Sequence, residues 1–196
     1  MEFRKMREDE LQSWYDRELC EAFPPHERKP LPVIRELMAS GCYTLWGLYD
    51  GGALLGYSAL WAPGEGAQQG TAYVVLDYLG VTAARRNAGI GAQILARLGE
   101  RGIRVIIESE CPAPGVDEAE NKIRARRIGF YERAGYQGRY EMAACGSRFV
   151  AMTAGGPEDV PAMLAAHRAV YGARRPDVKI PLEPGEAPPP AFWGAT

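Results

Sequence analysis

The stretch Leu76–Glu100 constrains the fold more than any other part of this 196-residue chain. An apolar run ends at Val81, a turn with Arg85 and Arg86 follows, and a helical pattern begins directly at Gly89. This order predicts a strand, a basic glycine-rich turn and a helix N-terminus. The first amides of a helix lack internal acceptors, and the helix dipole favours an anion beside them. The stretch therefore predicts an anion site, where glycine lets the backbone approach the ligand closely.

Two well-known phosphate motifs are absent from the chain. The dinucleotide fingerprint G-x-G-x-x-G needs a third small residue, and Ile94 stands at that position. The P-loop needs a Gly-Lys pair, and the sequence contains none. The turn instead reads Arg-x-x-Gly-x-Gly from Arg86 to Gly91. Because so short a pattern also arises by chance, the rest of the chain must decide what it binds.

Composition excludes several classes of function. The net charge of −2 gives no reason to expect a nucleic-acid or membrane surface. No apolar run approaches the ~20 residues of a membrane span, and the N-terminus lacks the apolar core of a signal peptide, so we expect a cytoplasmic protein. The four cysteines form no C-x-x-C pair and only two histidines occur, so we expect neither a metal site nor disulfides.

Hydrophobic periodicity and turn signals predict a mixed sheet with helices, an α+β or α/β domain of three layers. The expected strands are Glu2–Lys5, Cys42–Tyr49, Ala53–Trp61, Ala72–Val81, Ile103–Glu108, Tyr136–Ala143 and Arg148–Thr153. Asp50-Gly51-Gly52 predicts a hairpin turn between the second and third of these strands. The expected helices are Arg7–Phe23, Leu31–Ser40, Gly89–Arg101, Asn121–Ala134 and Pro157–Tyr171. Residues 174–196 are rich in proline and show no periodicity, so we expect an extended arm or a disordered tail.

Three segments in this order resemble signatures of the GNAT superfamily of acetyl-CoA-dependent N-acetyltransferases. They are the strand and turn of Leu76–Gly91, the buried strand VIIESE at Val105–Glu110, and the helix and Gly-aromatic turn of Arg126–Tyr136. The resemblance implies a GNAT-like three-layer α/β fold, with a central mixed β-sheet flanked by helices. We expect the acetyltransferase domain at residues 1–153, a C-terminal helix packing on it at 154–173, and the proline-rich tail at 174–196.

The resemblance implies acetyl-CoA as a co-substrate. The turn amides would cradle its pyrophosphate, with Arg85 or Arg86 adding charge, and the backbone of Leu79 and Val81 would pair with the pantetheine arm like an extra strand. The Leu79 amide would also stabilise the oxyanion. Asn121 is either a cofactor contact or the N-cap of its helix. The predicted cofactor-binding residues are Leu79, Val81, Arg85, Arg86, Asn87, Ala88, Gly89, Ile90, Gly91 and Asn121.

The resemblance also suggests a general acid. Tyr131 stands where many members of the superfamily carry a tyrosine near the thioester sulfur. A phenol of pKa ~10 can donate a proton to a departing thiolate. The alternative for Tyr131 is a core aromatic beside Phe130.

Carboxylates on two strands are candidate bases. Asp77 shares a strand face with Leu79 and is a candidate base or amine-binding group, or else one half of a buried ion pair with one of the arginines. Glu110 shares a face with Glu108 at the end of the next strand and is a second candidate base, or else a solvated strand end. The sequence leaves open which of the three carboxylates is the base.

These features predict an N-acetyltransferase that moves an acetyl group to a primary amine by direct attack in a ternary complex. The alternative is a non-catalytic acyl-CoA-binding or regulatory module on the same fold. Cys111 has no histidine nearby in the sequence, so we expect no acyl-cysteine intermediate. The acceptor is expected to be a small-molecule or peptide amine, which the sequence does not identify, and the protein to be a monomer or homodimer.

Overall fold

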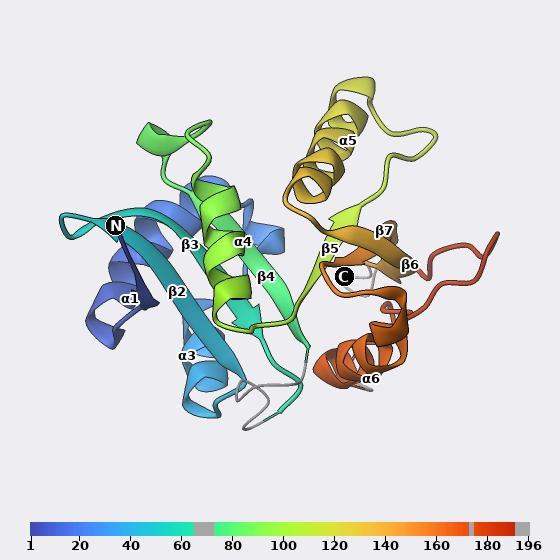
Figure 1. Ribbon diagram of the computed structural model, residues 1–196. Coiled ribbons are helices and arrows are strands. Elements are labelled where there is room, and N and C mark those ends of the chain that lie inside the picture. Colours follow the sequence, from blue (N-terminus) through green and yellow to red (C-terminus); the bar gives the residue numbers. More distant parts are fainter. Residues whose placement is uncertain (65–72, 173–174, 191–196) are drawn as a thin grey trace. The chain divides into compact units, whose positions relative to one another are not determined.

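The computed structural model describes residues 1–64, 73–172 and 175–190. Its seven strands are hydrogen-bonded in the order β1–β2–β3–β4–β5–β7–β6 (Figure 1). Strands β4 (Val74–Val81) and β5 (Val105–Glu110) run parallel, whereas the β1–β2, β2–β3, β5–β7 and β6–β7 pairs are antiparallel. The predicted α/β class, a mixed sheet with helices, is confirmed.

The chain divides into two compact units. Unit 1 comprises Met1–Gly70 and Leu76–Ile103, and unit 2 comprises Thr71–Val75 and Arg104–Thr196. Strand β4 contributes to both, because Val74 and Val75 pair with β5 in unit 2 while its remaining residues belong to unit 1. Each unit is described by itself below.

Unit 1 is built around an antiparallel hairpin. Its turn is Gly51-Gly52, where both residues have positive φ, and it falls within the predicted hairpin turn Asp50-Gly51-Gly52. Unit 1 contains β1 (Glu2–Lys5), α1 (Glu8–Trp14), the π-helical turn η1 (Tyr15–Leu19), α2 (Cys20–Ala22), η2 (Pro25–Glu27), α3 (Leu31–Ala39), β2 (Tyr43–Asp50), β3 (Ala53–Trp61), η3 (Ala83–Arg85) and α4 (Ile90–Glu100).

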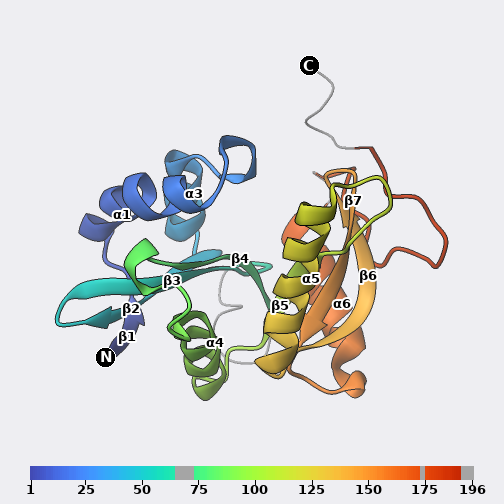
Figure 2. The same cartoon turned by 90° about the horizontal axis from the view of Figure 1, so that it is seen from above.

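Helices cover both faces of the strands of unit 1. Helices α1 and α3 lie on one face and α4 on the other (Figure 2). Leu11 and Ile34 are fully buried against the strands, and each such side chain stabilises the fold by roughly 1.5–3 kcal/mol. On the other face, a Cβ at Gly56 of β3 would lie 2.9 Å from Ile90 of α4, so glycine allows this helix to approach closely.

The predicted continuous helix over Arg7–Phe23 is wrong in its middle. After α1, the backbone widens into the π-helical turn η1, in which the Cys20 amide bonds to the Tyr15 carbonyl. Trp14 and Leu19, five positions apart, are both buried in the core. A single π turn brings residues at this spacing onto one face, which an α-helix does not.

Unit 2 joins an antiparallel strand trio to two helices. Helices α5 and α6 lie on opposite sides of its strands (Figure 1). The hairpin turn is Cys145-Gly146, and both residues have positive φ. Besides β5 and the start of β4, unit 2 contains α5 (Glu118–Arg133), β6 (Gln137–Ala144), β7 (Ser147–Thr153), η4 (Pro157–Asp159) and α6 (Val160–Tyr171).

Arg175–Pro190, the described part of the proline-rich tail, is held on β6. Lys179 and Ala143 exchange two backbone hydrogen bonds of 2.9 and 3.0 Å. Ile180 and Leu182 are buried, and Asp177 accepts a hydrogen bond from the Cys145 amide. This part of the tail is therefore an extended arm. Residues 173–174 and 191–196 of the predicted helix segment and tail lie outside the described residues, and the domain boundaries stay predictions.

Candidate functional site

The predicted anion turn connects β4 to α4 in unit 1. After β4, the short helix η3 leads into Asn87 and Gly89, whose φ angles are 65° and 75°. Every residue from Ala83 to Gly89 is exposed, whereas Ile90 and Gly91 are buried. A Cβ at Gly89 would meet nothing within 4 Å, so the turn has open space above it. The exposed backbone ahead of the helix N-terminus suits an anionic group.

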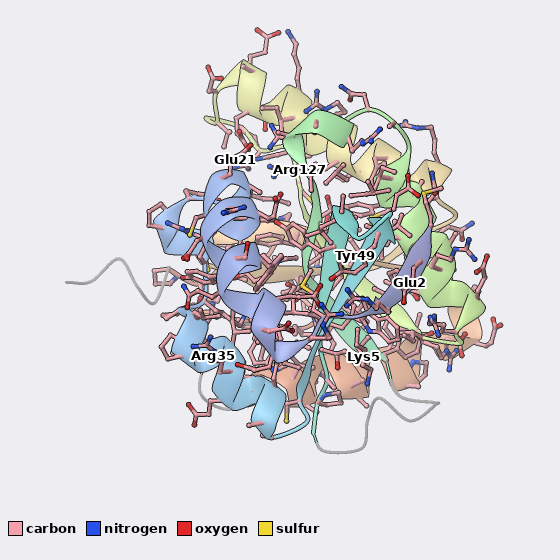
Figure 3. The ribbon with its side chains drawn as sticks, turned by 90° about the vertical axis from the view of Figure 1, so that its left-hand side faces the viewer. Glu2, Lys5, Glu21, Arg35, Tyr49 and Arg127 are labelled. Atoms are coloured by element: carbon pink, nitrogen blue, oxygen red, sulfur yellow. The ribbon has the colours of Figure 1, made fainter. Side chains whose placement is uncertain are left out.

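Arg86 in this turn forms an ion pair with Glu21 of α2. Its guanidinium lies 2.9 Å from a carboxylate oxygen of Glu21, and each side chain is about half exposed. Glu21 lies at the carboxyl end of the helical run that begins with α1 (Figure 3). An exposed pair of this kind contributes little to stability, so Arg86 can exchange Glu21 for another anion at low cost.

Strand β4 presents Asp77, Leu79 and Val81 in the predicted alternation. These three residues are half-buried, whereas the residues between them are buried. The parallel ladder with β5 includes only Val74 and Val75 of β4. The carboxyl half of β4 therefore has backbone groups outside that ladder, and an extended ligand could pair with them.

Asp77 lies at the centre of a polar cluster in unit 1. Its Oδ1 is 2.6 Å from Nζ of Lys29, and its Oδ2 accepts a hydrogen bond from the Tyr43 hydroxyl. The pKa of Tyr43 is raised well above its usual value, first by burial and then by the charge of Asp77, so this phenol remains a donor. The predicted alternative of a buried ion pair thus describes Asp77, although its partner is a lysine.

Tyr131 lies on α5 in unit 2, beside Phe130 at a ring-centre distance of 5.1 Å. Burial raises the pKa of its phenol to about 12, and the charge of Arg127 acts in the opposite direction. The phenol therefore keeps its proton at neutral pH. Both readings of the sequence, a proton donor and a core aromatic, are compatible with this setting.

Glu110, at the end of β5, is joined to α5 through Arg124. An oxygen of Glu110 lies 3.0 Å from the guanidinium, which also contacts Glu120 at 3.3 Å and donates to the Cys111 carbonyl. The carboxylate is therefore not a solvated strand end. A substrate group would have to compete with Arg124 for this carboxylate.

Asn121 is not the N-cap of its helix, because α5 begins earlier than predicted, at Glu118. The cap is Asp117, whose carboxylate accepts hydrogen bonds from the amides of Ala119 and Glu120. Asn121 instead bonds to both backbone groups of Ala113 at 2.9 Å and so holds the loop before the helix. A contact of Asn121 with a cofactor stays a prediction.

Glu108 belongs to a buried cluster that joins β5, β6 and α6. His167 is fully buried, with Nε2 at 2.5 Å from Glu108 and Nδ1 at 2.8 Å from the Tyr140 hydroxyl. Tyr171 donates to the same carboxylate at 2.8 Å. These contacts give Glu108 a structural role in anchoring α6 on the strands.

The predicted site residues fall into two groups. The anion turn, Leu79, Val81 and Asp77 belong to unit 1, and Glu110, Asn121 and Tyr131 belong to unit 2. Sequence reasoning missed Lys29 and Tyr43, the partners of Asp77. No local pattern marks them, because they lie 48 and 34 positions from Asp77 along the chain.

Burial raises the pKa of the Cys111 thiol, which makes it a poorer nucleophile at neutral pH. Within the described ranges, no group of three or more His, Cys, Asp or Glu side chains is arranged to hold a metal ion. Among the same residues, no helix is long and apolar enough to cross a membrane.

Comparison with known proteins gives two positive findings and one negative. A family profile described as "Acetyltransferase (GNAT) domain" matches residues 41–138, half of the chain. A search of curated proteins found no match. Solved structures share the fold, as the following three show.

A GNAT-family protein from Bacteroides thetaiotaomicron has a TM-score of 0.65 at 22% identity, over 88% of this chain and 99% of that one. An aminoglycoside 6'-N-acetyltransferase complexed with coenzyme A has a TM-score of 0.57 at 17% identity, over 80% and 98%. Arabidopsis thaliana Naa50, in complex with the bisubstrate analogue CoA-Ac-MVNAL, has a TM-score of 0.53 at 16% identity, over 77% and 96%. At these identities the likeness is one of fold.

Proposed function

Because the chain belongs to the GNAT acetyltransferase family, we propose that it transfers an acetyl group from acetyl-CoA to a primary amine by direct attack in a ternary complex. Two similar structures contain coenzyme A or an analogue of it, one an aminoglycoside acetyltransferase and the other bound to a peptide conjugate. The acceptor is therefore proposed to be an amine of a small molecule or a peptide.

The turn before α4 carries the proposal. Its backbone is exposed from Ala83 to Gly89, it includes two arginines, and the space above Gly89 is open. A pyrophosphate fits such a site, because it needs amide donors and positive charge and would clash with a side chain at the glycine. The chain residues that would hold it are those from Arg85 to Gly91.

The residues of β4 would hold the rest of acetyl-CoA. Leu79 and Val81 lie in the half of β4 beyond its ladder with β5, so their backbone groups can pair with the amides of pantetheine. Acetyl-CoA supplies a thioester carbonyl. The Leu79 amide is the proposed donor to its oxygen, on which negative charge develops when an amine attacks.

The transfer itself forms an N–C bond and breaks the C–S bond. The attacking amine must be neutral, so its ammonium form first loses one proton, for which Asp77 is the proposed base. The proton that the nitrogen loses as the amide forms replaces the one given to the departing thiolate. Tyr131 is the proposed donor to the departing thiolate. We favour Asp77 over Glu108 and Glu110, because Glu108 anchors α6 and Glu110 is paired with Arg124.

Calorimetric titration with acetyl-CoA tests the proposal. We expect wild type to bind and Gly89→Trp to lose binding by at least tenfold, because the indole would occupy the space above the turn. Gly89→Ala carries the same strain at positive φ without the bulk. Gly102→Trp, at the other end of α4 with φ of 70°, is the control for a bulky residue in a similar conformation.

The outcomes separate the candidate functions. Equal affinity of wild type and Gly89→Trp would refute the pyrophosphate site. Binding of acetyl-CoA without release of CoA on any of a broad set of amines would favour the non-catalytic acyl-CoA-binding module instead.

A further inference from the structure

Lys29 lies where the ammonium group of another molecule could bind. Its Nζ is 2.6 Å from Asp77, 4.4 Å from the centre of the Trp61 ring and 5.7 Å from that of Tyr78. A carboxylate combined with aromatic faces is an arrangement that selects cations, because the carboxylate supplies charge and the ring faces are electron-rich. The three side chains therefore form an ammonium site whose occupant belongs to the same chain.

The backbone of Lys29 is held independently of its side chain. The Lys29 amide donates to the Tyr78 hydroxyl at 2.8 Å, and that hydroxyl donates to the Glu27 carbonyl at 2.9 Å. Tyr78 thus fixes the loop before α3, while the neighbouring Asp77 binds the end of the lysine side chain. The Lys29 ammonium can leave Asp77 by rotation of its four-carbon stem, without movement of the loop.

The burial of Asp77 explains why the site is filled. The exposed fraction of its side chain is 14%, and that of Lys29 is 23%. A carboxylate so far removed from water is costly without a cation beside it. Lys29 supplies this cation when no other is present. A second ammonium can take the same carboxylate oxygen only if Lys29 leaves, so the two must compete.

We propose that Asp77, Trp61 and Tyr78 form the subsite for a primary alkylammonium acceptor, and that Lys29 is an internal occupant which the acceptor displaces. That the bound ammonium is the acetyl acceptor rests on the proposed acetyltransferase function. The site binds the acceptor as an ammonium, and the bound group passes its proton to Asp77 before it attacks. Since Lys29 reduces the fraction of molecules with a vacant site, it raises the acceptor concentration needed for saturation.

Binding of n-butylammonium chloride, measured by calorimetry without acetyl-CoA, tests the subsite. This cation reproduces the end of a lysine side chain. We expect Lys29→Ala to bind it at least tenfold more tightly than wild type. Lys29→Arg, which keeps a cation beside Asp77, should bind it no better than wild type. Adding Asp77→Asn to Lys29→Ala should abolish the gain, while the amide still accepts from Tyr43.

Equal binding by Lys29→Ala and wild type, or a gain that survives Asp77→Asn, would overturn the subsite. Release of CoA from acetyl-CoA with n-butylamine then tests its link to the acceptor. We expect KM for the amine to fall about tenfold in Lys29→Ala, as removal of a competing occupant requires. Turnover with an unchanged KM would refute this link. If neither protein binds acetyl-CoA, the proposed transferase function fails while the ammonium-binding result stands.

Discussion

At the scale of single residues, the three candidate bases, Asp77, Glu108 and Glu110, differ in how easily the side chain paired with each of them can move away. Asp77 is paired with a lysine on a flexible stem, whereas Glu108 is fixed by a fully buried histidine. Glu110 is paired with Arg124, which also bonds to Glu120 and the Cys111 carbonyl. Exchange of the partner is therefore easiest at Asp77. This difference could not be read from the sequence, where all three are acids on predicted strands.

The role of Tyr131 can be tested by removing its hydroxyl. A phenol with a pKa of about 12 holds its proton more tightly than a thiol, so it stabilises the thiolate mainly by a hydrogen bond. We expect Tyr131→Phe to lower turnover by about 10²-fold, near the small end of the range for general acids, and to leave acetyl-CoA binding unchanged. Steady-state kinetics on an amine identified by CoA release would measure this.

Tyr136→Phe is the matched control for Tyr131→Phe. Burial also raises the pKa of Tyr136 to about 12, and it follows the same helix. Its hydroxyl should be dispensable for turnover. A similar loss in both variants would indicate damage to the packing of the helix, and unchanged turnover in Tyr131→Phe would remove this residue from the mechanism.

At the scale of elements, features that depend on a few neighbouring residues were predicted well from the sequence. The glycine pair at 51–52 and the alternation along β4 depend on neighbours in sequence, and both are confirmed. The π-helical turn was missed because it depends on which core positions Trp14 and Leu19 fill, and the strands decide that. The start of α5 was misplaced for a related reason, since Asp117 and Asn121 are both good caps and only Asp117 meets free helix amides.

The junction of β1 and α1 predicts a specific dependence of stability on pH. Arg4 of β1 binds Glu10 of α1 through two hydrogen bonds of 2.7 and 2.8 Å, which lower the pKa of Glu10 to about 2. A lowered pKa stabilises the folded state above the unfolded-state pKa of ~4.3, and this stabilisation is lost as pH falls toward 2. We expect Glu10→Gln to cost about 1–2 kcal/mol at pH 7, after allowance for partial exposure.

Urea unfolding at pH 7 and pH 2.5 measures this effect. The gap in unfolding free energy between wild type and Glu10→Gln should narrow at the lower pH. Glu8→Gln on the same helix is the control, because Glu8 is largely exposed in its pair with Arg35 and should matter by less than about 0.5 kcal/mol. A gap that does not change with pH would show that the Arg4 pair does not set the stability of this junction.

At the scale of the whole molecule, the order of elements and the sheet class followed from the sequence, but the division into two units did not. The division falls within β4, between Val75 and Leu76, where the sequence is continuously apolar. The described tail illustrates the same limit. Its prolines predicted little regular structure, yet Ile180 and Leu182 are buried beside β6. Such contacts depend on partners tens of residues away, which local patterns do not encode.

Because the chain forms two compact units, we expect a destabilising substitution in one unit to weaken mainly the elements of that unit. His167 is fully buried in unit 2 and bonds to both Glu108 and Tyr140. His167→Ala would leave a cavity and remove one of the donors to Glu108, so we expect a loss of about 3 kcal/mol or more in unfolding free energy. His167→Gln should lose less, since its amide can restore one hydrogen bond.

Hydrogen exchange followed by mass spectrometry would show where the loss of His167 acts. Protection should fall in β5, β6 and α6, because the cluster joins these three elements, and should persist in α1, α3 and the β2–β3 hairpin of unit 1. Equal loss of protection across both units would mean that the chain opens as a single cooperative structure. In that case α6 would stabilise the whole molecule, and the anion turn of unit 1 would depend on a histidine that belongs to the other unit.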